Sequence, residues 1–132
     1  MAKIIRHATN PADPGAAPSA TVEDARFIAD AIRKGERSAR EVLNASIDQI
    51  QSTDARVIAF TDHTFERAYA KADAIDDARA RGAVLPALAG VPFAVKNLFD
   101  VRGLPTRAGS KINRTVAPAA QDAFLVQQLE GA

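Results

Sequence analysis

Apolar side chains recur at helical spacing in the segment that follows Thr21. The sequence Thr21-Val-Glu-Asp24 offers a hydroxyl and two carboxylates for a helix N-terminus, where backbone amides lack partners. Gly35 can end this helix in the left-handed conformation. The buried stripe of the predicted helix then consists of Val22, Ala25, Ile28, Ala29 and Ile32.

A second helix is predicted from Ser38-Ala-Arg-Glu41, because these residues fit a reciprocal capping box between a serine and a glutamate. Residues 57–60 then form a short extended piece, and a third helix begins near Thr64 and ends at Gly82. This third helix carries charges of both signs on one side, which is typical of a solvated face. The apolar positions are Val42, Leu43, Ile47 and Ile50 in the second helix, and Phe65, Ala68, Tyr69, Ala72 and Ile75 in the third.

Residues 90–96 give the strongest strand pattern, because the run is apolar on both faces, as in a strand covered by helices on both sides. Pro92 lacks a backbone donor, so it fits the first position of such a strand. Residues 97–116 predict an ordered loop, and Asp122 can cap a last helix. Helices that lead into a buried strand, followed by another helix, predict an α/β fold.

The two ends of the chain differ from this folded pattern. Residues 1–20 hold several Pro residues and a Gly among small side chains, and they predict a flexible N-terminal extension because they cannot bury much apolar surface. Residues 21–132 form the predicted domain. The chain stops at Gly131-Ala132, where a further strand is expected, so we interpret the domain as truncated and the sheet as incomplete.

Composition narrows the classes of function. The 132 residues carry a formal net charge of +1 and no basic block, so we expect no direct nucleic-acid partner. Cysteine is absent, which excludes disulfides and thiolate chemistry, and His7 and His63 fit no metal-ligand spacing. No apolar run approaches the roughly 20 residues that span a bilayer, and the N-terminus lacks an apolar signal segment. We therefore expect a cytoplasmic protein with no membrane partner.

Lys96 is the strongest candidate for chemistry, because it ends the apolar run. Burial disfavours the charged form of a lysine, which can then act as a general base near neutral pH. The alternative is that its methylenes cover apolar surface while the ammonium stays in water. Other polar residues have simpler interpretations: Ser110 as a turn or cap residue, His63 as part of a helix entry, and Asp100 and Asp122 as turn and cap residues.

Three segments around Lys96 form a longer pattern: Pro86-Ala-Leu-Ala-Gly-Val-Pro-Phe-Ala-Val-Lys96, Asp100-Val-Arg-Gly-Leu-Pro-Thr106 and Ala108-Gly-Ser110. With the order of the helices around them, these segments resemble the amidase signature hydrolases, and the resemblance covers nearly all of residues 21–132. Within the family, Ala94-Val-Lys-Asn-Leu-Phe-Asp100 and Ala108-Gly-Ser-Lys-Ile-Asn-Arg114 are most similar to carboxybiuret hydrolase subunits.

The resemblance implies the N-terminal portion of the amidase signature fold, with helices packed on a mixed central sheet that is incomplete in this chain. It also implies hydrolysis of a C–N bond by a Ser–cis-Ser–Lys triad, without a cofactor or a metal. Lys96 matches the lysine of this triad, whose neutral amine takes a proton from the bridging serine. The Gly-Gly-Ser-Ser-Gly-Gly segment of the family does not occur in the 132 residues, so only Lys96 is carried over and we expect the chain alone to be inactive. Family members often have an aspartate after the lysine, whereas Asn97 stands there in this chain.

The implied substrate is a small amide or urea-like molecule such as carboxybiuret, and the implied partners are further copies of the chain and a small companion subunit. Two alternatives stay open. One is the A subunit of a tRNA-dependent amidotransferase, which receives glutamine as ammonia donor. The other is a non-catalytic interaction module, which would need to bury a stable core by itself and unfold cooperatively.

Overall fold

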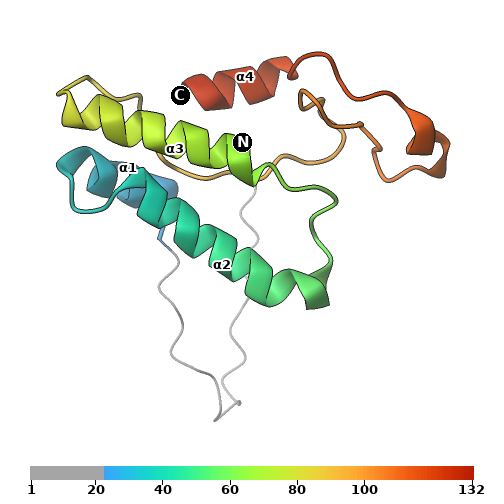
Figure 1. Cartoon of the computed structure of the whole chain (residues 1–132), viewed down its shortest axis with the longest axis horizontal. Coiled ribbons are helices and arrows are strands. Elements are labelled where there is room, and N and C mark those ends of the chain that lie inside the picture. Colours follow the sequence, from blue (N-terminus) through green and yellow to red (C-terminus); the bar gives the residue numbers. More distant parts are fainter. Residues whose placement is uncertain (1–22) are drawn as a thin grey trace, which may run out of the picture.

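The structure is a computed structural model that describes residues 23–132. Its helices are α1 (Ala25–Lys34), α2 (Ala39–Val57), α3 (Phe65–Ala80) and α4 (Phe124–Gly131), with a 3₁₀ helix η1 (Lys111–Thr115) before the last one. Helix α3 lies between α2 and α4, and α1 and η1 lie toward opposite ends of the long axis (Figure 1). The predicted extension, residues 1–20, and the predicted helix-start residues Thr21 and Val22 lie outside the described residues.

The caps of the first two helices follow the sequence closely. Asp24 is the N-cap of α1, and its Oδ1 accepts from the Phe27 backbone N–H over 2.8 Å. Gly35 ends α1 with a φ of 76°, as predicted. Ser38 and Glu41 form the predicted capping box: the Ser38 hydroxyl accepts from the Glu41 N–H over 3.0 Å, and the Glu41 carboxylate accepts from the Ser38 N–H over 2.8 Å.

Helix α2 extends to Val57, so the prediction that an extended piece covers residues 57–60 is wrong for its first residue. Val57 is the last residue of α2, and Ile58 follows in the left-handed region with a φ of 53°. Asp54 explains this ending. Its backbone oxygen accepts from the Ile58 N–H over 2.7 Å, and its carboxylate accepts from the Ala59 N–H over 2.7 Å, so one aspartate satisfies two amides beyond the helix.

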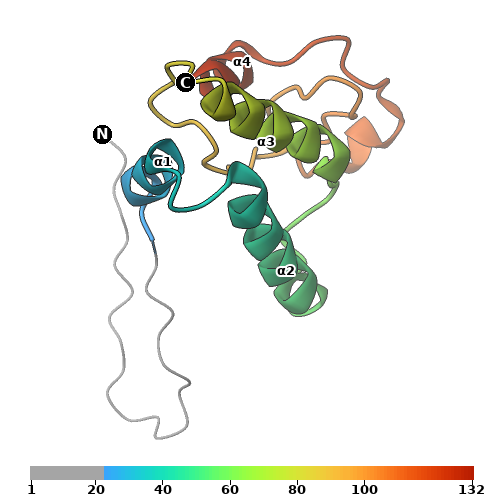
Figure 2. The ribbon, with the colours of Figure 1, turned by 60° about the vertical axis from the view of Figure 1, so that its left-hand side comes forward.

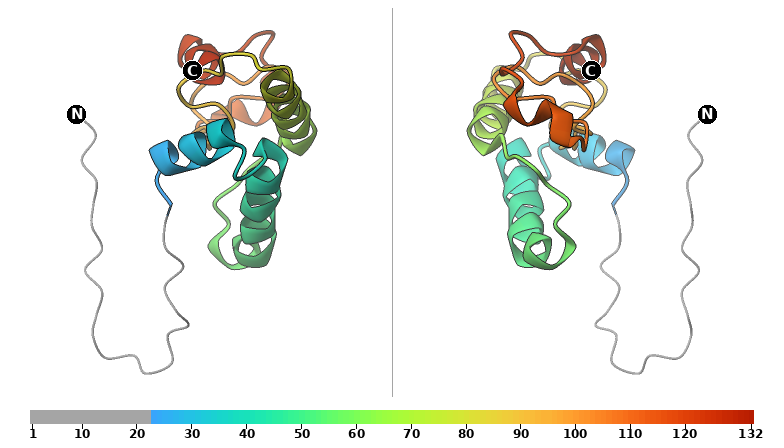
Figure 3. Two further views of the ribbon diagram at one scale, coloured as in Figure 1. Left: turned by 90° about the vertical axis from the view of Figure 1, so that its left-hand side faces the viewer. Right: turned by 90° about the vertical axis from the view of Figure 1, so that its right-hand side faces the viewer.

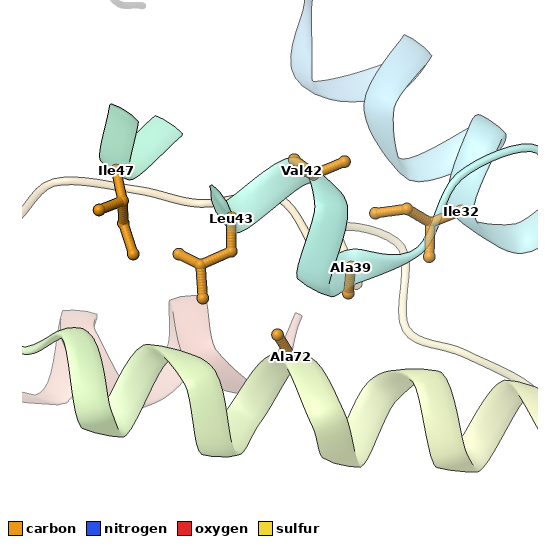
Figure 4. Packing of buried hydrophobic residues seen from close by; sticks show 6 residues of the cluster. All are labelled: Ile32, Ala39, Val42, Leu43, Ile47 and Ala72. Carbon is orange, nitrogen blue, oxygen red and sulfur yellow. The ribbon is translucent and has the colours of Figure 1, made fainter. Parts of the chain in front are cut away.

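The core lies where α1, α2 and α3 meet. Ile32 is completely buried, and it belongs to one cluster with small and branched side chains of α2 and with Ala72 of α3 (Figure 4). Figure 2 shows that α2 lies near α3 at its first turns and points away from α3 at its last turns. The two helices therefore pack against each other along only part of their length. The buried cluster is Ile32, Ala39, Val42, Leu43, Ile47 and Ala72, with Ile28, Phe65, Ala68, Tyr69, Ile75 and Leu85 partly buried against it.

The predicted α/β fold with a mixed central sheet is wrong for the part of the chain that the structure describes, which contains helices and loops and no strand. Residues 90–96 run as coil, and the backbone bonds at its ends are turn bonds, from the Val91 N–H to Leu88 O and from the Leu98 N–H to Lys96 O. A strand needs a neighbouring strand to pair its amides and carbonyls. An apolar run alone therefore does not make a sheet.

The loops that follow α3 pass between α3 and α4 when the molecule is viewed end-on (Figure 3). Gly90 allows one end of this region to lie close against α1 and α2, because it has no Cβ. A Cβ at this position would lie 2.4 Å from Ile32 Cδ1 and 3.1 Å from Ala39 Cβ. Further along, the Gly103 N–H donates to Ala119 O and the Ala119 N–H donates to Leu104 O, both over 2.9 Å. The predicted ordered loop is confirmed, with η1 inside it.

Helix α4 forms as predicted, but its predicted cap does not. Ala123 is the N-cap residue and provides no side-chain bond, and α4 begins at Phe124. Asp122 instead accepts from Arg67 of α3 and from the Arg102 N–H. A charged partner in fixed geometry is a stronger attraction for a carboxylate than uncharged amides at a helix end.

Candidate functional site

Lys96 lies at an open hollow of about 520 Å³, which we call the central hollow. Residues of α2, α3 and α4 line this hollow together with residues 84–106. The Lys96 carbonyl accepts from the N–H groups of Leu98 and Phe99 over 2.7 and 3.1 Å, so the chain turns directly after the lysine. These two bonds fix the backbone carbonyl of Lys96 in a tight turn.

The apolar run before Lys96 is more open than the sequence predicts. Phe93 is 44% exposed, Pro92 and Ala94 are exposed, and so is Lys96 itself. The expectation of a buried run that ends in a lysine is therefore wrong for residues 23–132, in which this run pairs with no strand and is largely exposed. Within this part of the chain, the Lys96 ammonium forms no hydrogen bond and no ion pair.

Asn97 connects the turn after Lys96 to two other segments. Its Nδ2 donates to Thr61 Oγ1 over 2.7 Å, and its Oδ1 accepts from the Arg107 N–H over 2.9 Å. Its backbone oxygen accepts from the Ala108 N–H over 2.7 Å. Three groups of one residue thus join residues 61, 97 and 107–108, and no sequence pattern indicated this arrangement.

An ion pair joins the same two segments as the Asn97 contacts. Arg107 Nη1 donates to Asp62 Oδ2 over 2.7 Å, and these two residues are the sequence neighbours of Ala108 and Thr61. The Arg107 carbonyl also accepts from Asn113 Nδ2 of η1 over 3.2 Å. The segment before α3 and the loop after Lys96 are therefore held together by two neighbouring contacts, the Asn97–Thr61 hydrogen bond and the Arg107–Asp62 ion pair.

The other predicted polar residues have local roles. Asp100 accepts from the Thr106 hydroxyl over 2.6 Å, a contact within the loop that follows Lys96. His63 precedes α3 as predicted, and its ring stacks on Phe65 with the centroids 4.6 Å apart. The Ser110 hydroxyl accepts from the Ile112 N–H over 3.3 Å and so caps η1, as predicted.

The remaining serines of the described chain also serve the backbone. Ser38 caps α2, while the hydroxyls of Ser46 and Ser52 donate to carbonyls of the same helix over 3.1 and 3.0 Å. A hydroxyl engaged in this way contributes to local structure. None of these serines faces Lys96 through a hydrogen bond within residues 23–132.

Arg67, Lys71 and Glu130 line the central hollow between α3 and α4, and together with Asp122 they form a network of charged residues. Arg67 donates to both oxygens of Asp122, over 2.9 and 2.8 Å, and its Nη2 lies 2.7 Å from Glu130. Lys71 lies 3.3 Å from the other oxygen of Glu130. The prediction that this side of the third helix is only a solvated face is therefore wrong for Arg67, whose partner lies 55 residues away in the sequence.

This network changes the acidity of its members. The hydrogen bonds from Arg67, and after them the bond from the Arg102 N–H, lower the pKa of Asp122 to about 2. Arg67 also lowers the pKa of Glu130, chiefly through its hydrogen bond, and the same two carboxylates raise the pKa of Arg67. All three groups are therefore charged at neutral pH, as an ion-pair network requires.

Two further properties concern ligands and membranes. Among residues 23–132, no three His, Cys, Asp or Glu side chains are placed together in a way that could hold a metal ion. None of the helices described is both long enough and apolar enough to cross a bilayer.

Comparison with known protein families gives a specific match. The Amidase family model matches residues 41–132, a range that includes Lys96 and Asn97. The chain is 57% identical over 105 residues to the AtzE subunit of 1-carboxybiuret hydrolase from Pseudomonas sp. (strain ADP), with 80% of this chain and 23% of the relative covered. It is 44% identical over 110 residues to the A subunit of the glutamyl-tRNA(Gln) amidotransferase from Mycobacteroides abscessus, with 83% and 22% covered.

Solved structures agree with this match. One is described as an inhibitor-bound vestigial protein complex that reveals the evolutionary origins of an s-triazine catabolic enzyme. Its chain superposes with a TM-score of 0.78 at 57% identity, over 80% of this chain and 23% of that one. The chain spans less than a quarter of the length of these relatives.

Proposed function

This chain belongs to the amidase family, and we propose that it supplies the general base of an amidohydrolase that cleaves the C–N bond of a small amide or urea-like molecule. The observation that carries the proposal is the family match, which includes Lys96. The position of Lys96 at the central hollow supports it, because a base needs access to a concave surface that can hold a substrate.

The mechanism that we propose follows the resemblance of the lysine motif. The neutral amine of Lys96 takes a proton from a bridging serine held by a cis peptide, and this serine takes the proton of the nucleophilic serine. The nucleophile then attacks the amide carbonyl, and the proton passes to the leaving nitrogen. Water hydrolyses the acyl-enzyme: the same lysine relay accepts the proton of the attacking water and returns it to the departing nucleophilic serine, which restores the neutral lysine. Both serines lie outside this chain's 132 residues.

The proposed substrate is carboxybiuret or a related urea-like acid. Its support is the 57% identity to a relative named as a 1-carboxybiuret hydrolase subunit. We propose a homo-oligomer with a small companion subunit on similar grounds, because a similar solved structure is described as a protein complex. Size-exclusion chromatography with light scattering, on the product purified with its genomic neighbours, tests this assembly, and a strictly monomeric product would contradict it.

The experiment uses the product of the whole open reading frame that contains this chain. Ammonia release from carboxybiuret and from simple amides is measured for the unsubstituted protein and for Lys96→Ala. We expect Lys96→Ala to lower kcat by about a thousandfold or more, because the proton relay loses its base. The matched control is Lys71→Ala, which removes another lysine from the same hollow and leaves Glu130 paired with Arg67. Activity that survives Lys96→Ala would overturn the proposal.

A second function is favoured by one specific observation, the 44% identity to the A subunit of an amidotransferase. In this case the protein would take glutamine as its ammonia donor and work beside a tRNA-binding partner. Glutaminase activity of the full product that rises on addition of such a partner would favour this function. A full product with neither activity that unfolds cooperatively would favour the interaction module.

A further inference from the structure

We propose that Asn97 is a positioning residue for Lys96. Its uncharged amide fixes the turn after the lysine to Thr61 and Arg107, and it does so without adding a negative charge at the residue that follows the lysine. This inference rests on the proposed role of Lys96 as the general base.

The Asn97 side chain both donates and accepts, and each bond reaches a different segment. Asn97 Oδ1 accepts from the partly buried Arg107 N–H, and Nδ2 donates to the Thr61 hydroxyl. An alanine would lose both bonds and leave the Arg107 N–H without its partner, which is costly for a group with little access to water. The residue after Lys96 is therefore tied on two sides by one short, stiff side chain.

An aspartate could keep the same bonds. A hydroxyl donates as well as accepts, so Thr61 could turn and donate to a carboxylate oxygen, while the other oxygen accepts from the Arg107 N–H. The bonds alone thus do not favour asparagine over aspartate. The difference between the two is one negative charge next to Lys96, which would stabilise the ammonium and oppose its use as a base.

The charged side chains nearest to the Asn97 contacts already pair with each other. Asp62 and Arg107 pair with each other across the two segments that Asn97 joins, at 2.7 Å. Asp100 is engaged by the Thr106 hydroxyl. An aspartate at position 97 would therefore add one negative charge to residues whose other charges are already paired or hydrogen-bonded. The other titratable groups that line the central hollow with Lys96 are His63 before α3, Arg67 and Lys71 on α3, and Glu130 on α4.

The test compares Asn97→Ala, Asn97→Asp and the control Asn44→Ala in the product of the whole open reading frame. Asn44 lies on α2, accepts from the Tyr69 hydroxyl and does not line the hollow. We expect Asn97→Ala to lower kcat by about tenfold to a hundredfold with a smaller change in KM, because the base is misplaced. Asn97→Asp should recover most of kcat at high pH, but the acidic limb of kcat/KM should move up by about half a unit.

The outcomes separate the two proposals. Loss of activity in Lys96→Ala together with an unshifted pH profile in Asn97→Asp would overturn the role of Asn97 alone. Activity that survives Lys96→Ala would overturn the base itself. A pH profile that shifts for Asn97→Asp and not for Asn44→Ala supports the inference, because a merely structural change does not move the ionisation of the base.

A measurement independent of activity tests the contacts themselves. Hydrogen exchange of the Arg107 and Ala108 backbone amides is followed by NMR in the 132-residue chain. We expect the Arg107 amide to exchange at least about tenfold faster in Asn97→Ala and at a nearly unchanged rate in Asn97→Asp and Asn44→Ala. Equal rates in all four proteins would show that the side chain of Asn97 does not hold this loop, and would overturn the inference.

Discussion

Arg67 and Asp122 form a two-pronged ion pair across 55 residues of sequence, with Nη1–Oδ1 and Nη2–Oδ2 distances of 2.9 and 2.8 Å. The pair joins α3 to the residue just before the N-cap of α4. Asp122 also accepts from the Arg102 N–H over 2.8 Å, so a single carboxylate connects three segments. Its side chain is only 12% exposed, which limits screening by water.

The first prediction concerns the pH dependence that this pair gives to stability. The pKa of Asp122 is lowered to about 2, so its stabilising effect is present above the ordinary aspartate range and is lost as the pH falls from about 4 to about 2. Asp122→Asn should therefore lower the free energy of unfolding by about 1 kcal/mol at pH 7. The deficit should shrink toward zero at pH 2. Urea unfolding followed by circular dichroism measures both values.

The control for this experiment is Asp77→Asn, which removes a carboxylate from α3 that takes part in no ion pair within residues 23–132. We expect its effect on the free energy of unfolding at pH 7 to be small. If Asp122→Asn shows the same deficit at pH 2 as at pH 7, the loss arises from packing and the ion-pair explanation is wrong.

A second prediction concerns the start of α2. Ser38→Ala removes the hydroxyl that accepts from the Glu41 N–H, and it should destabilise the chain by about 1 kcal/mol. Ser52→Ala is the matched control, because its exposed hydroxyl only donates to the Gln49 carbonyl within the same helix. Thermal unfolding should show a lower Tm for Ser38→Ala alone. A similar decrease in both variants would mean that the capping box does not stabilise α2.

Local features were predictable because they depend on residues close in sequence. The Ser38–Glu41 box spans four residues, and Gly35 needs only the preceding helix to adopt its left-handed conformation. The end of α2 was missed although Asp54 lies four residues before Ile58. Aspartates occur throughout this chain, and only the folded backbone shows which of them bonds beyond a helix end.

The features that were predicted wrongly, or were not predicted, depend on partners that are distant in the sequence. An apolar run at residues 90–96 becomes a strand only beside another strand, and residues 23–132 supply none. Asp122 was predicted as a helix cap because it directly precedes the predicted last helix. In the fold, Arg67 lies beside it and binds its carboxylate instead. Lys96 could be singled out from its motif. The Asn97 contacts could not, because Thr61 and Arg107 carry no pattern that links them.

A third prediction tests the small core. Ile32 is completely buried between α1 and α2, so Ile32→Ala should cost about 2 to 4 kcal/mol through lost burial and the cavity that remains. Ile112→Ala is the control, because Ile112 is 90% exposed in η1 and its truncation should change stability by less than about 0.5 kcal/mol. Urea unfolding of both variants gives the comparison. Equal effects would show that the cluster around Ile32 does not hold the helices together.

The last prediction concerns the contact between Gly90 and Ile32. Gly90 has a φ of 79°, and a Cβ there would lie 2.4 Å from Ile32 Cδ1 and 3.1 Å from Ala39 Cβ. Gly90→Ala therefore combines backbone strain with overlap in the core, and we expect a loss of about 2 to 4 kcal/mol. Gly103→Ala separates the two effects, because Gly103 has a φ of 86° with no atom within 4 Å of the added Cβ. Its loss should be about 1 kcal/mol, from strain alone.

The overlap can be relieved from the other side. Ile32→Val removes Cδ1, the atom nearest to the added Cβ, so it should cost about 1 kcal/mol in the natural chain and less, or nothing, in the Gly90→Ala background. A double-mutant cycle built from urea unfolding measures this coupling. Additive losses would mean that Gly90 is required only for its backbone conformation. Coupling between the two substitutions would show that the glycine is required so that the segment leading to Lys96 can lie directly against the core.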